Sequence, residues 1–129
     1  MAEGSNYDVA VVGAGYVGVP LAATFAEAGC KVLLVDVVED VVAALNRGES
    51  HIADVPSDRL APLVEQGRVQ ATTSYDDLRD TGAILIALPT PLSHQREPDL
   101  SIVESAARRL AKVLREGQLV VLESTTWPG

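Results

Sequence analysis

The chain has 129 residues, of which 47% are hydrophobic and 22% charged, a balance typical of one globular domain and unlike that of a disordered segment. Its formal net charge of −8 argues against a nucleic-acid partner or an anionic membrane surface, because either would require a basic face. No stretch approaches the roughly 20 apolar residues of a membrane span, and the N-terminus lacks a secretory pattern, so we expect a cytoplasmic protein.

The first strong pattern is a strand followed by a glycine-rich turn. Residues 9–12 form a short β-branched run, typical of a strand that is buried on both faces. The run enters a G-x-G-x-x-G motif, in which Gly13 allows a tight turn, Gly15 allows a pyrophosphate to approach, and Gly18 allows close helix–strand packing. Helical spacing over residues 16–28 then places free N–H groups beside the same turn, which favours a bound phosphate.

An acidic residue completes this pattern. A second apolar strand is predicted at 31–35, and Asp36 follows it, roughly 20 residues beyond the glycines, where a carboxylate can bind a ribose 2′-hydroxyl. The same carboxylate would repel a 2′-phosphate, and residues 37–40 contain no arginine to receive one. The sequence therefore predicts that the chain binds NAD rather than NADP.

The rest of the chain alternates helices with strands. The pattern predicts helix 39–47, a helix capped by Ser57 or Asp58, strand 68–72, a brief helix 74–79, strand 83–88, a helix opened by Asp99 or Ser101, and strand 118–123. Such alternation predicts an α/β fold, a Rossmann-type doubly wound parallel sheet of strand order 3-2-1-4-5. The glycine turn, the loop at 89–91 and the segment 124–126 should meet at the crevice where the winding reverses.

Several features receive a structural interpretation. Residues 1–6 are predicted to be a disordered leader. The single cysteine, Cys30, excludes an internal disulfide and is interpreted as a small buried residue, because nothing near it in sequence would lower its pKa. His51 is interpreted as an ordinary loop histidine without an evident partner, and His94 and Arg96 as parts of a solvated loop.

Five short motifs together resemble the nucleotide-sugar dehydrogenases, that is, the UDP-glucose/GDP-mannose dehydrogenase family. They are Gly13-Ala-Gly-Tyr-Val-Gly-Val-Pro-Leu-Ala22, Leu45-Asn-Arg-Gly48, Pro89-Thr-Pro91, Pro98-Asp-Leu100 and Glu123-Ser-Thr-Thr-Trp-Pro-Gly129. The form of two of them is most similar to the branch that acts on UDP-N-acetylhexosamines. The resemblance implies an enzyme that oxidises a sugar C6 alcohol to a carboxylate with NAD, the whole enzyme being a homo-oligomer.

The resemblance also implies a set of site residues. The Pro-Thr-Pro loop would lie against the cofactor, and Thr125 would support catalysis near the reacting centre, where it helps to order a water or the substrate oxygen. For Thr90 and Thr125, a purely structural hydroxyl remains the alternative. The candidate cofactor contacts are Gly13, Gly15, Tyr16, Val17, Gly18, Asp36, Pro89, Thr90, Pro91, Ser124 and Thr125.

The family's catalytic cysteine has no match in this chain, because Cys30 lies elsewhere. Residues 7–129 are therefore interpreted as an NAD-binding domain that stops before the substrate and catalytic domains, and that binds NAD without turnover. Two alternatives remain open. One is a free-standing NAD-sensing regulatory module, and the other is a dehydrogenase of hydroxyacids or 6-phosphogluconate.

Overall fold

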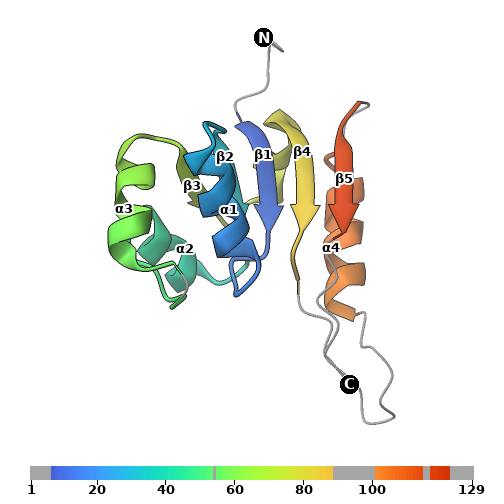
Figure 1. The fold of residues 1–129 in the computed structure, drawn as a ribbon. Helices are drawn as coiled ribbons and strands as arrows, with labels where there is room; N and C mark the ends of the chain where they lie inside the picture. The colour runs from blue at the N-terminus through green and yellow to red at the C-terminus, as the bar shows by residue number, and fades with distance from the viewer. Residues whose placement is uncertain (1–6, 54, 89–100, 115–116, 123–129) are drawn as a thin grey trace, which may run out of the picture.

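The computed structural model describes residues 7–53, 55–88, 101–114 and 117–122. Within these residues five parallel strands form one sheet, in the order β3-β2-β1-β4-β5 (Figure 1). The elements are β1 (Tyr7–Val12), α1 (Gly18–Glu27), β2 (Val32–Val35), α2 (Glu39–Asn46), α3 (Ser57–Glu65), β3 (Val69–Thr72), the 3₁₀ helix η1 (Tyr75–Asp80), β4 (Thr81–Ile86), α4 (Ser101–Ala111) and β5 (Leu119–Leu122). The predicted Rossmann-type fold and strand order are confirmed.

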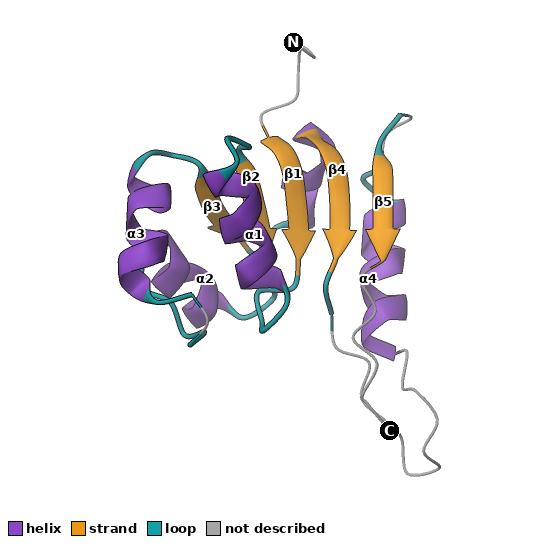
Figure 2. Ribbon diagram, in the orientation of Figure 1, coloured by secondary structure: helices purple, strands orange, loops and turns teal. Residues whose placement is uncertain are grey.

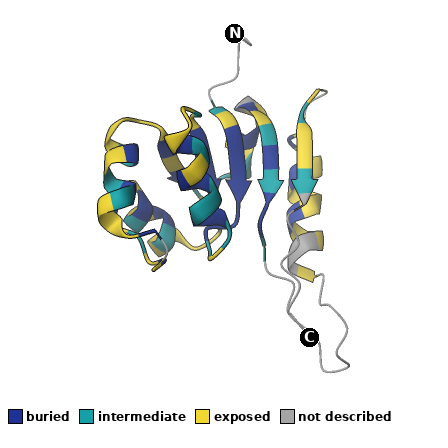
Figure 3. Cartoon of the chain, viewed as in Figure 1, coloured by how far each residue is buried: buried dark blue, intermediate teal, exposed yellow. Residues whose placement is uncertain are grey.

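Helices cover both faces of the sheet, as Figure 2 shows. Alternate residues of β1 point to opposite faces, so Val9 and Val11 pack beneath α1, whereas Ala10 and Val12 pack toward η1 and α4. This explains why β1 and β2 read as continuous apolar runs. A strand that is covered on both sides favours apolar side chains at successive positions. Figure 3 shows that burial is concentrated in these central strands, whereas β5 has exposed residues, with Leu119 62% exposed.

Most element boundaries differ from the prediction by one or two residues, and the starts of β4 and α3 show why. Strand β4 begins at Thr81, two residues earlier than expected, because Thr81 is buried and its hydroxyl donates to the Leu78 carbonyl at 2.7 Å. That internal bond lets a polar residue enter a strand that we predicted from apolar residues alone. The predicted side-chain cap of α3 is also wrong. Pro56 occupies the N-cap position, and the Ser57 hydroxyl instead accepts the Ser50 N–H at 2.9 Å.

Asn46, at the end of α2, protects the outer strand of the sheet. Its side-chain Nδ2 donates to the Ala71 carbonyl at 2.9 Å, and its Oδ1 accepts the Ala71 N–H at 2.8 Å. Among the described strands β3 has no partner on that side, and the amide takes the place of a neighbouring strand there. The motif at 45–48 therefore has a structural explanation. Among the described residues, no helix is long and apolar enough to cross a membrane.

Candidate functional site

The turn after β1 is tied to the strands on either side of it. The Gly13 N–H donates to the Val35 carbonyl at 2.7 Å, and the Ala87 N–H donates to the Val12 carbonyl at 2.8 Å. Gly13 has a φ of +106°, and a Cβ built on it would lie 2.6 Å from the Ala87 carbonyl oxygen. Only glycine combines this backbone conformation with so close an approach to the end of β4.

The other two glycines of the motif have different surroundings. A Cβ on Gly18 would lie 1.7 Å from the Gly13 carbonyl oxygen and 3.4 Å from Val11 Cγ1, so the start of α1 is packed against the turn and, less tightly, against β1. By contrast, a Cβ on Gly15 would meet no heavy atom within 4 Å. Packing inside the described structure therefore explains Gly18 but not Gly15. An open approach to the backbone at Gly15 fits the predicted place of a pyrophosphate.

Helix α1 begins directly beside this open position. The Val19 N–H donates to the Gly15 carbonyl at 3.1 Å, and no side chain caps the helix at Val17. In the first helical turn Pro20 has no N–H, and the N–H groups of Val19 and Leu21 donate to the Gly15 and Val17 carbonyls. The N–H groups of Gly15 and Gly18 are therefore the ones at the start of the helix that can face an anion. Together with the positive end of the helix dipole, they form a suitable environment for an anion. The first turn of α1 has no acidic residue that would compete for these groups.

Asp36 lies at the end of β2 and is bonded to the glycine turn. Its Oδ2 accepts the Ala14 N–H at 2.9 Å, and its Oδ1 accepts the Val38 N–H at 3.0 Å. The side chain is half-buried, which leaves part of the carboxylate open to a ligand. These two bonds fix the carboxylate before any ligand binds. The acid and the turn, 22 residues apart in sequence, therefore form one site.

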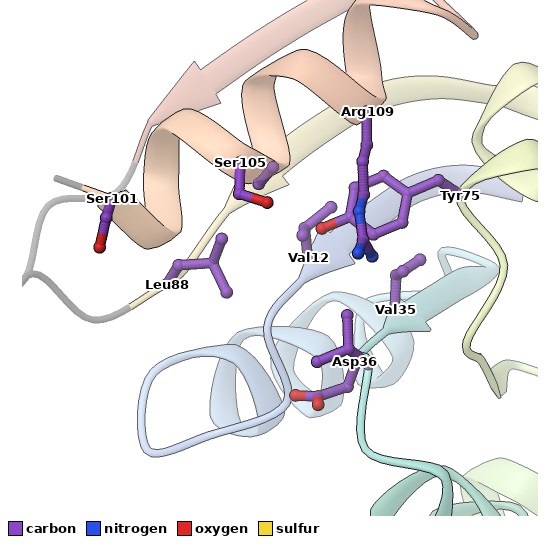
Figure 4. A pocket seen from close by; sticks show the side chains of 10 residues that line it. Val12, Val35, Asp36, Tyr75, Leu88, Ser101, Ser105 and Arg109 are labelled. Atoms are coloured by element: carbon purple, nitrogen blue, oxygen red, sulfur yellow. The ribbon is translucent and has the colours of Figure 1, made fainter.

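A cleft of about 330 Å³ adjoins Asp36 (Figure 4). Its wall is mainly apolar, formed at the ends of β1, β2 and β4 by Val12, Val35 and Leu88. At its far side the Arg109 guanidinium lies 5.5 Å from the centre of the Tyr75 ring. Burial raises the pKa of Tyr75, an effect that Arg109 opposes and Asp36 reinforces. A flat aromatic group attached to a ribose would suit this combination of apolar walls and a carboxylate at the mouth.

Sequence reasoning missed the residues on the far side of the cleft. Tyr75 comes from η1, whereas Ser101, Ser105 and Arg109 come from α4. Ser101 was predicted only as a possible helix start, and none of these residues lies in a recognisable binding motif. Only the fold brings these two elements together beside β2. The cleft also contains a basic residue, Arg109, although the segment directly after Asp36 contains none.

His51 lies in the loop after α2, as predicted, but it has a partner that was not evident in the sequence. Its Nε2 lies 2.9 Å from the Ala14 carbonyl oxygen. The contact joins the loop after α2 to the glycine turn, across 37 residues of sequence. This contact could not be predicted, because neither residue belongs to a sequence pattern that specifies distant pairing.

The structure brings the predicted contacts of the glycine turn together with Asp36. Within that turn Tyr16 is 82% exposed, and Val17 packs partly against the core. The remaining candidates, including the one assigned a catalytic role, lie outside the described residues: Pro89, Thr90, Pro91, Ser124 and Thr125. The fold, the turn and the acid define a dinucleotide-binding domain of the Rossmann class.

Comparison with known proteins places the chain more narrowly. Residues 7–129 match the model of the "UDP-glucose/GDP-mannose dehydrogenase family, NAD binding domain". The chain is 44% identical to a UDP-N-acetyl-D-mannosamine dehydrogenase of Yersinia pestis over 92% of its own length and 28% of the relative's. The chain therefore belongs to the UDP-glucose/GDP-mannose dehydrogenase family, and its cofactor is NAD, as predicted.

Solved structures agree with this assignment. A UDP-D-ManNAc dehydrogenase from Pyrococcus horikoshii superposes with a TM-score of 0.86 and 37% identity, covering 95% of this chain and 29% of that one. A UDP-glucose dehydrogenase from Pyrobaculum islandicum gives a TM-score of 0.85 and 34% identity, covering 100% of this chain and 31% of that one. The relatives from Yersinia pestis and Pyrococcus horikoshii support the UDP-N-acetylhexosamine branch. The chain spans less than a third of the length of each of these relatives.

Proposed function

We propose that this chain holds NAD with its adenosine in the cleft beside Asp36 and its pyrophosphate on the glycine turn. The observation that carries the proposal is the hydrogen bond from the Ala14 N–H to Asp36 Oδ2, which joins the two predicted binding elements into one preformed site. Each carboxylate oxygen accepts one backbone N–H, and an ionised carboxylate has about four acceptor positions, so ribose hydroxyls can still be bound.

The other parts of the cofactor have matching environments. The apolar ends of β1, β2 and β4 bind the adenine ring and exclude water from its faces. The N–H groups of Gly15 and Gly18, at the start of α1, receive the pyrophosphate, which can approach closely because Gly15 has no side chain. The candidate contacts Pro89, Thr90, Pro91, Ser124 and Thr125 are part of this proposal through the family resemblance alone. Bound NAD would supply the hydride acceptor of the reaction.

For the whole protein we propose a nucleotide-sugar 6-dehydrogenase. It oxidises the C6 alcohol of a UDP-sugar, a UDP-N-acetylhexosamine or UDP-glucose, to a carboxylate, and it works as a homo-oligomer. The proposal rests on the identity of 44% and 43% to two UDP-N-acetyl-D-mannosamine dehydrogenases, from Yersinia pestis and Escherichia coli. The 129 residues alone bind NAD without turning over the sugar, with Thr125 in a supporting role at the reacting centre.

Two measurements test these proposals. Calorimetric titration of the 129-residue chain should show binding of NAD and much weaker binding of NADP, and equal affinities would refute the role of Asp36. The product of the natural gene should be several times larger than 13.6 kDa and should form NADH when it is supplied with UDP-N-acetylmannosamine or UDP-glucose. A natural product that ends at Gly129, binds NAD and oxidises no sugar would favour an NAD-sensing module instead.

A further inference from the structure

The main chain of Ala14 is held by side chains on both sides. Its N–H donates to Asp36, and its carbonyl lies 2.9 Å from His51 Nε2. A carbonyl oxygen only accepts hydrogen bonds, so His51 carries its proton on Nε2 and donates it. Ala14 itself is 3% exposed, which leaves little room for the turn to shift between these two partners.

The loop that carries His51 is fixed on both sides of it. Ile52 is 4% exposed and Val55 is fully buried, so both belong to the core beneath α1. The Ser50 hydroxyl accepts the Ile52 N–H at 3.1 Å, and the Ser57 hydroxyl accepts the Ser50 N–H at 2.9 Å. His51 is exposed, but its backbone has little freedom. Its contact with Ala14 is therefore built into the fold of the loop.

The position of the Ala14 carbonyl determines the direction of the next N–H. In a planar trans peptide the carbonyl and the following N–H point in opposite directions. A hydrogen bond that holds the Ala14 oxygen toward His51 therefore aims the Gly15 N–H away from that loop. Gly15 is the residue whose side-chain position is open.

We propose that His51 is a positioning residue for cofactor binding, which orients the Gly15 N–H toward the pyrophosphate. The inference rests on the proposed placement of NAD and adds to it a residue from outside the glycine motif. His51 acts through Ala14, so it supports the pyrophosphate and not the adenosine, which Asp36 and the cleft bind. This division separates the proposal from a role in folding alone, which would affect both halves of the cofactor equally.

The experiment compares three variants of the 129-residue chain. His51→Ala removes the donor, whereas His51→Gln keeps an N–H at a similar reach from the backbone. Arg68→Ala is the matched control, because Arg68 Nη1 also donates to a main-chain carbonyl, that of Gly29 at 3.0 Å. Gly29 and Arg68 precede β2 and β3, so this contact lies at the opposite ends of the strands from Asp36. The affinities for NAD, ADP and adenosine are measured by calorimetry, and urea unfolding measures stability.

We expect His51→Ala to bind ADP and NAD about five- to tenfold more weakly, the effect of one hydrogen bond, with adenosine affinity within about twofold of the parent. His51→Gln should restore ADP binding, and Arg68→Ala should leave it unchanged. In ligand-free protein, the amide NMR signal of Gly15 should move in His51→Ala and return in His51→Gln.

The possible failures are distinguishable. A parent chain that fails to bind NAD overturns the proposed function, and this inference with it. A parent that binds NAD, with a His51→Ala variant that binds ADP equally well, overturns the inference alone. A variant that loses ADP and adenosine to the same extent also overturns it, because His51 would then only stabilise the fold.

Discussion

Gly15→Ala should separate cofactor binding from folding. Gly15 does not have a left-handed φ, and its new Cβ would meet no heavy atom within 4 Å. The free energy of unfolding should therefore stay the same or rise by up to about 1 kcal/mol, because alanine restricts the unfolded chain. The methyl group nevertheless occupies the approach to the turn. The loss of one hydrogen bond to a charged phosphate, about 1.5–3 kcal/mol, corresponds to a roughly 10- to 150-fold lower affinity for NAD.

The matched control is Gly18→Ala, which makes the same chemical change three residues further along the motif. There the new Cβ would lie 1.7 Å from the Gly13 carbonyl oxygen, an overlap that requires α1 or the turn to move. We expect a loss of about 3 kcal/mol or more, a large part of the stability of a small domain. Urea unfolding and NAD calorimetry on both variants complete the test. If Gly15→Ala binds NAD like the parent, the pyrophosphate does not lie against Gly15.

Three further predictions concern the acid, the sheet edge and the cleft. Asp36→Ser should lower NAD affinity and change the NADP-to-NAD affinity ratio in favour of NADP by about tenfold, because the charge that repels a 2′-phosphate is gone. Calorimetry with both cofactors measures this ratio. An unchanged ratio would refute the proposed contact between Asp36 and the ribose. Asn46→Ala should lower the free energy of unfolding, measured in urea, by about 1–3 kcal/mol, because two hydrogen bonds to Ala71 are lost at the edge of β3. An unchanged midpoint of urea unfolding would show that water replaces these bonds fully. Burial raises the pKa of Tyr75, so the folded state retains the phenol proton longer than the unfolded state. The contribution of Tyr75 to the free energy of unfolding should therefore be fully present below the unfolded pKa of about 10, and it should be lost as the pH rises through the higher folded value. Tyr75→Phe should remove this part of the loss in urea titrations at alkaline pH.

The features that could be predicted from sequence are those that depend on short-range patterns. The runs in β1 and β2 are apolar because both of their faces are covered, and the glycine spacing reflects contacts within a single turn. Asp36 was predictable for the same reason, because its place at the end of β2 is local. From these elements the strand order followed by the general rules of parallel α/β folds.

The remaining features depend on contacts between distant segments. Tyr75 and Arg109 meet only because η1 and α4 pack on the same face of the sheet, and neither residue type indicates this in sequence. The contact between His51 and Ala14 likewise requires the loop after α2 to return to the turn after β1. The start of β4 could not be predicted for a similar reason. Thr81 is polar, and it can begin the strand because its hydroxyl donates to the Leu78 carbonyl, a contact that the apolar pattern does not indicate.

Ala14 connects the recognition of the two halves of the cofactor. Asp36, the proposed ribose acceptor, holds its N–H, and His51 holds the carbonyl that precedes the proposed pyrophosphate donor. Changes at Asp36 should therefore weaken binding in two ways, by loss of the ribose contact and by release of the turn. For this reason the adenosine affinity of an Asp36 variant underestimates its effect on NAD. The difference between the two affinities measures how strongly the carboxylate supports the turn.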